Sequence, residues 1–281
     1  MSEKWTLFVD VEKCTGCQNC FIAVKDEYVG NESPGYFASQ PAENATWFTV
    51  DHYERGPTPF TQVTYLPRMC QHCDDAPCAK AARDGAVVKR ADGIVIIDPQ
   101  KARGQKQIVG ACPYGAVIWN EELQIPQAWP FEAHLLDQGW KRTRVEQVCP
   151  TQALKSEKLS DSALAKKTAS ENWAQLKPEA HSQPRVFYRG LDRINKVFVA
   201  GTVEIDRIGV RDCFEGAVAQ LSRGGNIVAT ARTDEFGDFK LDGLTPGGVG
   251  VLRIAQGAAT IFEQEIGLDQ STSVGAVVFA A

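Results

Sequence analysis

Eight of the nine cysteines in this 281-residue chain are arranged in a pattern that can bind metal. Two segments, KCTGCQNC and MCQHCDDAPC, each gather three cysteines, and two more cysteines each precede a proline further along. The residues concerned are Cys14, Cys17, Cys20, Cys70, Cys73, Cys78, Cys112 and Cys149. Thiolates are soft ligands that favour zinc, copper and iron–sulfur clusters. The chemistry to expect is therefore metal or cluster binding.

The spacing of these cysteines favours 4Fe-4S clusters. In bacterial ferredoxins three closely spaced cysteines hold one cluster, and the cysteine before a proline ligates the other. This spacing gives four motifs of four positions: 14, 17, 20 and 24; 70, 73, 78 and 82; 102, 105, 108 and 112; and, with an insertion, 129, 132, 145 and 149. Pairing the first motif with the fourth and the second with the third predicts two ligand sets. They are Cys14, Cys17, Cys20 and Cys149, and Cys70, Cys73, Cys78 and Cys112.

The same pairing leaves two sets of positions with no cysteine at all. They are Val24, Trp129, Glu132 and Val145, and Ala82, Ala102, Gln105 and Ile108. A cluster with only two or three protein thiolates would be labile. Loss of single ligands should leave partial sets, whereas here each set is either complete or wholly without cysteine. Mostly apolar side chains can fill a vacated space and limit the cost of a void. We interpret the pattern as a four-site scaffold that carries two 4Fe-4S clusters.

Zinc and disulfides are the alternatives for these cysteines. Structural zinc commonly uses two well-separated ligand pairs, whereas three cysteines within seven residues fit the corner of a cubane better. The C-x2-C spacing and a reducing compartment disfavour disulfides. His72 is expected either to lie near cluster sulfur atoms or to be a surface group. The ninth cysteine, Cys213, is expected to be buried and inert.

Composition and charge restrict the class of protein. A hydrophobic fraction of 43% and a charged fraction of 23% are ordinary for a soluble globular protein. The net charge of −5 argues against nucleic-acid binding. We expect no signal peptide, because MSEKWTLFVDVEKC lacks a basic region followed by an apolar one. No apolar run approaches the roughly 20 residues of a membrane span. We expect a soluble, cytoplasmic protein, with export beside a partner that carries a twin-arginine signal as the alternative.

The elements that position the cysteines repeat within the N-terminal half. TLFVDVEKC and GIVIIDPQKA both read as an apolar strand that ends in Asp10 or Asp98, just before a motif. This repeat predicts a duplicated ferredoxin-like domain over residues 1–155. Residues 30–69, rich in glycine, proline and aromatics, read as a long ordered insertion that is functional or packs on a partner.

Residues 156–194 are expected to form a helical and extended linker. Within it, residues 160–177 have the spacing of a helix, with Leu164 and Trp173 on one face. Ser160 is placed to cap this helix and Pro178 to stop it.

From residue 195 to 281 the pattern changes to short β-type runs. Seven of them are separated by glycine, proline, asparagine and aspartate turns, which predicts a seven-stranded sandwich or barrel. RTDEFGDFKLDGLTPG resembles a hairpin of carboxypeptidase-regulatory-like or Cna-B-type modules. The fold class expected for the whole chain is α+β, with an iron–sulfur domain followed by this all-β domain.

Catalytic signatures are missing from the sequence. There is no nucleophile with a base, no nucleotide-binding loop and no paired carboxylates. Two basic runs adjoin the cysteine motifs and are solvated faces, contacts for a partner, or charges that raise the reduction potential of a cluster. They comprise Lys101, Arg103 and Lys106, and Lys141, Arg142 and Arg144. On its own, the chain is expected to move electrons or to organise a partner.

The residues also resemble a known family. The cysteine array, ACPYGAVIWNEE and PRVFYRGLDR look like the iron–sulfur subunits of the dimethyl-sulfoxide-reductase family of molybdenum or tungsten enzymes. Within it, DVEKCTGCQNCF, RMCQHCDDAPC and DCFEGA with DEFGDFKLD are similar to the small subunits of pyrogallol-phloroglucinol transhydroxylase and resorcinol hydroxylase. The resemblance spans nearly the whole chain.

This resemblance implies a heterodimer with a large catalytic subunit that holds a molybdenum bis-pterin cofactor and acts on phenols. The eight cysteines would be the cluster ligands of the electron-transfer subunit. Val24, Trp129, Glu132 and Val145 depart from the family pattern of three or four clusters and put a continuous relay in doubt. The alternatives are a subunit of a sulfoxide, polysulfide or oxoanion reductase, and a structural adaptor whose clusters only stabilise the fold.

Overall fold

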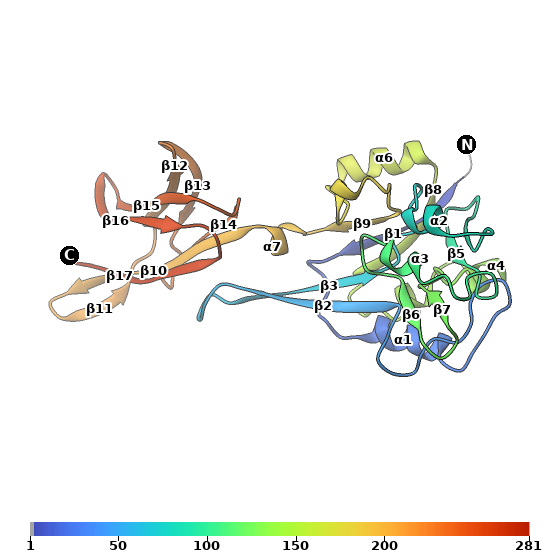
Figure 1. Cartoon of the computed structure of the whole chain (residues 1–281). Helices are drawn as coiled ribbons and strands as arrows, with labels where there is room; N and C mark the ends of the chain where they lie inside the picture. The colour runs from blue at the N-terminus through green and yellow to red at the C-terminus, as the bar shows by residue number, and fades with distance from the viewer. Residues whose placement is uncertain (1–2, 281) are drawn as a thin grey trace. The chain divides into compact units, whose positions relative to one another are not determined.

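The structure, a computed structural model, describes residues 3–280 and divides into two compact units. Residues 3–52 and 65–191 form the first, here called the cysteine unit because it contains all eight motif cysteines. Residues 53–64 and 192–280 form the second, here called the strand unit (Figure 1).

A three-stranded sheet leads the chain into the first cysteine motif. Strand β1 (Lys4–Asp10) lies between β8 (Leu154–Leu159), which runs antiparallel to it, and β9 (Val186–Arg189), which runs parallel. The apolar run of β1 is buried, including Leu7, Phe8 and Val9. Burial of this run explains why the sequence forms a strand here, and Cys14 follows four residues after its end.

Hairpins and short helices make up the rest of the cysteine unit. The paired strands are β2 (Phe48–Arg55) with β3 (Gln62–Met69), β4 (Val87–Lys89) with β5 (Val95–Ile97), and β6 (Ile118–Asn120) with β7 (Ile125–Gln127). The end of β2 and the start of β3, within residues 53–64, belong to the strand unit. The helices are α1 (Asn19–Tyr28), α2 (Pro77–Ala81), α3 (Gln107–Gly110), α4 (Ala133–Asp137) and α5 (Arg144–Gln147). The two similar segments of the sequence therefore differ in pairing, since β1 has two neighbours and β5 has one.

Helix α6 (Asp161–Ser170) is shorter than the sequence predicts. Ser160 caps it as expected, because its Oγ accepts the backbone N–H of Ala163 at 3.2 Å. Leu164 packs against Phe8 and Phe187. The helix ends at Ser170 because Asn172 takes a left-handed backbone with φ of 56°, so Trp173 lies outside it. The short η1 (Pro178–Ala180) and α7 (Asp192–Asn195) follow.

The strand unit contains eight strands within its described residues, one more than predicted. The first sheet contains β10 (Val197–Arg207), β11 (Val210–Cys213), β14 (Asp238–Leu244) and β17 (Thr272–Ala280). The second contains β12 (Val218–Arg223), β13 (Asn226–Arg232), β15 (Val249–Gln256) and β16 (Ala259–Gly267). Apolar residues from both sheets, such as Phe239 and Leu252, share one core.

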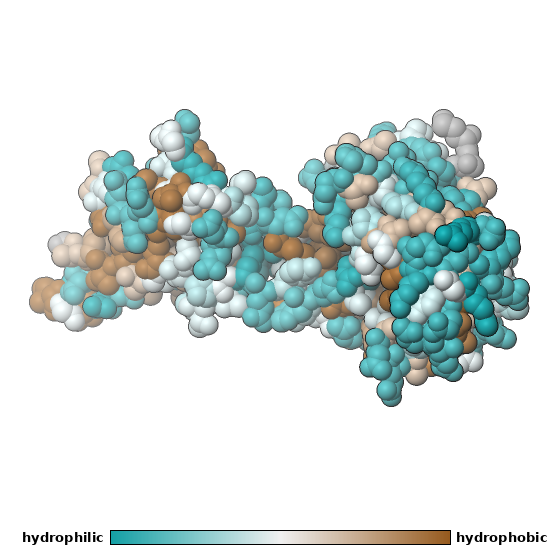
Figure 2. Space-filling model, in the orientation of Figure 1, coloured by the Kyte–Doolittle hydropathy of each residue, from teal (hydrophilic) through white to brown (hydrophobic). Residues whose placement is uncertain are grey.

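The additional strand, β11, corrects the prediction for Cys213. This cysteine is exposed and not buried, because all four residues of β11 are exposed at the edge of its sheet. Ile208, in the turn before β11, is fully accessible, and Val210, at the start of β11, is exposed as well. Figure 2 shows exposed hydrophobic surface on the strand unit. Within residues 3–280, none of the helices has the length and apolar character needed to cross a bilayer.

Candidate metal-cluster sites

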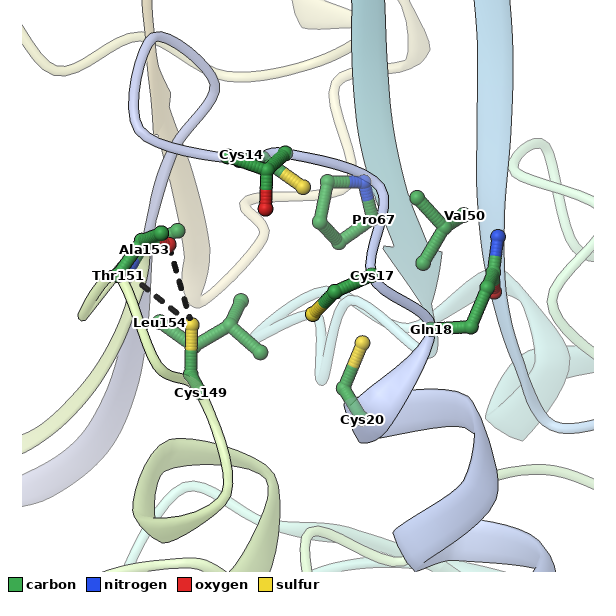
Figure 3. Close-up of a pocket in the computed structure, with 11 residues that line it drawn as sticks. Cys14, Cys17, Gln18, Cys20, Val50, Pro67, Cys149, Thr151, Ala153 and Leu154 are labelled. Atoms are coloured by element: carbon green, nitrogen blue, oxygen red, sulfur yellow. Dashed lines mark hydrogen bonds between the residues drawn. The ribbon is translucent and has the colours of Figure 1, made fainter.

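Four of the predicted ligands come together in the cysteine unit. Cys14, Cys17, Cys20 and Cys149 line one pocket, and Figure 3 shows their sulfur atoms turned toward the space between them. Cys14 and Cys17 lie in the loop after β1, and Cys20 lies in the first turn of α1. Cys149 comes from the turn after α5. We call these four residues site A.

Glycine at position 16 fixes the loop between the first two thiols of site A. Gly16 has a φ of +68°, which side chains other than glycine rarely adopt. A Cβ atom built there would lie 2.5 Å from the ring of Tyr65. The close approach of Tyr65 and the left-handed backbone together explain why glycine stands between Cys14 and Cys17.

The chemistry of site A fits a bound metal cluster. Burial raises the pKa of the Cys20 thiol to about 12 and also raises that of Cys14. A thiolate in this pocket therefore needs a positive partner to replace its proton. Backbone amides already aim at the sulfur atoms, since the N–H of Ala153 donates to Cys149 Sγ at 3.2 Å.

Cys70, Cys73, Cys78 and Cys112 also come together and are called site B. The last three share one buried core, and the thiols of Cys73, Cys78 and Cys112 all lie near enough to that of Cys70 to raise its pKa further, burial being the main cause. Cys70 follows β3, Cys78 lies in α2, and Cys112 follows α3, which contacts α2. Burial also raises the pKa of Cys78, to about 11.

Two hydroxyl groups near site B were not predicted from the sequence. Cys73 Sγ lies 3.3 Å from the Oγ of Ser182, which lies 2.9 Å from the hydroxyl of Tyr114. Once Cys73 is a thiolate, Ser182 would donate to it. Ser182 is 109 residues away from Cys73 in the chain, and no local motif in the sequence marks it as a neighbour.

His72 is buried, so the surface alternative for it is wrong. Its Nδ1 accepts the backbone N–H of Val95 at 3.1 Å, and its ring packs edge-on against Trp129 and Phe131. Burial lowers the pKa of His72 well below its usual value, and nearby Lys89 lowers it further. The backbone amide of His72 hydrogen-bonds to Cys70, so this residue is part of the surroundings of site B.

Zinc is the single-ion alternative for these cysteines. A tetrahedral zinc with sulfur ligands at about 2.3 Å would hold its thiolates roughly 3.8 Å apart. Among residues 3–280, no three cysteine, histidine or carboxylate side chains are grouped in a way that would hold one metal ion.

The first set of positions without cysteine is filled by buried side chains. Val24, Trp129 and Val145 have no exposed surface and Glu132 is 1% exposed. The carboxylate of Glu132 accepts the backbone N–H groups of Arg144 and Val145. Burial raises the pKa of Glu132 to about 7. We call these four residues the filled set A.

The second such set, Ala82, Ala102, Gln105 and Ile108, is called the filled set B. Its three apolar members belong to the same core as Cys73, Cys78 and Cys112. Gln105 Oε1 accepts the backbone N–H of Arg83 at 2.8 Å, and its Nε2 donates to the carbonyl of Lys101 at 2.8 Å. In both filled sets, one polar side chain thus takes backbone N–H groups while its companions fill the space.

Comparison with known proteins agrees with the cysteine pattern. Residues 61–159 match the 4Fe-4S dicluster domain family. The chain is 41% identical to the pyrogallol hydroxytransferase small subunit of Pelobacter acidigallici, over 87% of this chain and 88% of that one. It is 33% identical to a subunit of tetrathionate reductase from Salmonella typhimurium, over 67% and 73%. It is 27% identical to the arsenate respiratory reductase iron-sulfur subunit ArrB of a Shewanella species, over 65% and 94%.

Proposed function

Because the chain belongs to the iron–sulfur small subunits of molybdenum enzymes represented by the pyrogallol hydroxytransferase small subunit, we propose that it is the electron-transfer subunit of an enzyme that hydroxylates or transhydroxylates phenols. The observation that supports this proposal most directly is the gathering of four thiols, from two separate stretches of chain, around the pocket of site A. Such a subunit needs no catalytic residues of its own.

The proposal includes two 4Fe-4S clusters. One is held by Cys14, Cys17, Cys20 and Cys149 and the other by Cys70, Cys73, Cys78 and Cys112. The domains would be a duplicated ferredoxin-like domain over residues 1–155, a linker over 156–194 and a β-sandwich over 195–281. The raised thiol pKa values and the amide donors of both sites support cluster binding, because a cluster supplies the positive charge that buried thiolates lack.

Bound clusters would supply one-electron redox chemistry. The residues of this chain hold and tune that chemistry. Burial of Cys20, Cys73 and Cys78 limits access of water to the thiolates. The Ala153 amide and the Ser182 hydroxyl point at Cys149 and Cys73, and hydrogen bonds to cluster sulfurs are among the factors that set reduction potential.

The active site would lie on a partner. The relatives are subunits of larger enzymes, which implies a larger catalytic partner for this chain as well. We place the molybdenum bis-pterin guanine dinucleotide on that partner, in a heterodimer in the cytoplasm. The filled sets shorten any relay through this subunit. A short relay would suit transhydroxylation, which has no net redox change, or electron exit from the nearer cluster.

Metal analysis of the co-purified complex tests this proposal. We expect iron near eight per small subunit, with molybdenum present only when a large subunit co-purifies and mass spectrometry identifies it. About four or twelve irons would overturn the assignment of two clusters. A partner without a pterin cofactor would overturn the enzyme class.

A reductase of an inorganic oxoanion is the second candidate, because a tetrathionate reductase subunit is 33% identical to this chain. The catalytic pocket of the large subunit separates the two, since a phenol and an oxoanion need different binding groups. A structural adaptor is the third. Rapid reduction of both clusters by the substrate-reduced complex would exclude it.

A further inference from the structure

A basic hollow lies on the surface of the cysteine unit beside site A. Trp140, Lys141, Arg142 and Gln147 line it, and it contains about 780 Å3 of space that includes open solvent. Trp140 is 40% exposed, and Lys141 and Arg142 are exposed as well. We call these four residues the basic hollow. Its charge is opposite to the net charge of −5 for the whole chain.

The charge of the hollow comes from Lys141 and Arg142. Within residues 3–280, neither Lys141 nor Arg142 forms an ion pair, whereas the next cation, Arg144, pairs with Asp26 at 2.7 Å and also with Glu27. The carboxylates that are close in sequence are engaged elsewhere. Asp137 pairs with Arg90 at 2.7 Å.

Glu146, the other nearby carboxylate, is also engaged, because its Oε2 accepts the backbone N–H of Ser156 at 2.9 Å. Lys141 and Arg142 therefore face solvent without an ion pair to any carboxylate in the described part of the chain. Partly exposed aromatic rings with cations around them are typical of protein contact surfaces.

Gln147 of the hollow lies two residues before Cys149 of site A, and two hydrogen bonds hold the segments around this turn. Gln147 Nε2 donates to the carbonyl of Arg142 at 3.2 Å, so the loop is joined to α5, two residues before Cys149. Asn19 Nδ2 donates to the carbonyl of Val148 at 3.3 Å, which joins the other cysteine segment to the same turn. Cys17 of site A is exposed. A protein seated on the hollow would therefore lie next to the accessible edge of site A.

We infer that the basic hollow is the docking surface for an acidic one-electron carrier protein that exchanges electrons with the cluster of site A. This inference rests on the proposed function. One electron passes between the carrier and the cluster, so one is oxidised and the other reduced by one electron, and no bond forms or breaks. Redox partners commonly use small, weak interfaces, and opposite charges speed their encounter.

Charge reversal in the intact complex tests the inference. The reagent is a reduced acidic 2Fe-2S ferredoxin, mixed in a stopped-flow instrument with the oxidised complex that carries Lys141→Glu and Arg142→Glu. At low salt we expect the second-order rate constant to fall about tenfold or more and its dependence on salt to flatten. The dissociation constant of the two oxidised proteins, measured by interferometry, should rise by a similar factor. That binding measurement does not depend on turnover.

The matched control is Lys158→Glu with Lys166→Glu. Both lysines are exposed, neither lines the hollow, and the pair changes the net charge by the same amount. We expect less than about a twofold change in rate for this control. An equal loss in both pairs would overturn the inference, because it would reflect net charge alone. Loss of the large subunit from the Lys141→Glu, Arg142→Glu protein would also overturn it and would assign the hollow to the subunit interface.

A small cationic viologen separates this inference from the proposed function. If reduced viologen reduces the cluster of site A but the ferredoxin rate does not respond to charge reversal in the hollow, the inference alone fails. If viologen reduces no cluster in the unmodified complex, the proposed electron-transfer function fails, and the inference fails with it.

Discussion

The cysteine unit contains two kinds of four-position site, and they provide different acceptors for their backbone N–H groups. Sites A and B surround their space with thiols and direct backbone amides toward the sulfur atoms, as Ala153 does toward Cys149. The filled sets have no thiol. There, Glu132 and Gln105 accept the backbone N–H groups while neighbouring apolar side chains occupy the space.

The difference shows that the amide donors of such a site come from the backbone fold, whereas their acceptor depends on the side chains present. Amide donors occur in all four places, so they are a property of the chain's path. Their acceptor changes from sulfur to a carboxylate or an amide oxygen. Because a buried donor without a partner costs about 1–3 kcal/mol, a site that lacks thiols needs another acceptor. Glu132 and Gln105 meet that need.

Removal of a single thiol should have the largest effect on this comparison. For Cys149→Ala we expect loss of the cluster of site A and a fall in iron from about eight to about four per chain, because three thiolates hold a cubane poorly. Cys112→Ala should give the same loss from site B. Iron analysis and electron paramagnetic resonance of each variant check this. Cys213→Ala is the control and should keep all its iron, since Cys213 is exposed in β11. Retention of full iron in Cys149→Ala would contradict the assignment.

Truncation in the filled set A should cost stability without loss of iron. Trp129 is fully buried against His72 and Phe131, so Trp129→Ala should lower the free energy of unfolding by about 3–5 kcal/mol. Denaturant unfolding followed by circular dichroism measures the change. Trp140→Ala, at a ring that is 40% exposed, is the control and should cost far less. Equal costs would mean that the filled set is not close-packed.

Titration of Glu132 should distinguish filled set A from filled set B. Its pKa in the folded chain, about 7, lies above the ordinary value of 4.5. The folded state therefore binds the proton more tightly, and this contribution to stability is complete below about pH 4.5 and is lost as the pH rises through 7. Between about pH 6 and pH 8 we expect a loss of about 1 kcal/mol.

Glu132→Gln should remove that part of the pH dependence, because its amide does not ionise. Denaturant midpoints of both proteins at the two pH values give the comparison. Gln105→Glu provides a matched control, since it places a carboxyl group in filled set B and should create a pH dependence of the same sign. An unchanged slope in Glu132→Gln would contradict the role given to this carboxyl group.

Ser182 should have the smallest effect, on the reduction potential of site B. Its Oγ lies 3.3 Å from Cys73 Sγ, whereas at site A the Oγ1 of Thr151 lies 3.7 Å from Cys149 Sγ. Ser182→Ala should lower the potential of site B by tens of millivolts, because a donor to the reduced cluster is lost. Thr151→Val should shift site A less. Redox titration with paramagnetic resonance reports both, and a larger shift at site A would reverse the ranking.

The cysteine spacing carried most of what could be predicted about the site. Sequence spacing alone grouped Cys149 with Cys14 and Cys112 with Cys70, and the structure brings these residues together. The family resemblance is confirmed by 41% identity to the pyrogallol hydroxytransferase small subunit. The eight ligand assignments remain a prediction.

Other features could not be read from local patterns. Ser182 reaches Cys73 only through tertiary packing, and the hydrogen bonds of Glu132 depend on where α5 begins. Cys213 was expected in the core because free cysteines are usually buried, but an edge strand exposes it. Helix α6 ends early at a left-handed Asn172, which helical spacing does not reveal.

The position of β9 determines which truncated fragments of this chain keep the sheet around β1 intact. Val186–Arg189 pair in parallel with β1, immediately before the first thiols, although the two strands are far apart in sequence. A fragment that ended at residue 155 would lack β9 and would contain only the first residues of β8, the other neighbour of β1. Exposed strand edges present unpaired backbone groups that can pair with other chains. Such a fragment should precipitate or form oligomers, whereas one that extends through Leu191 keeps both neighbours of β1.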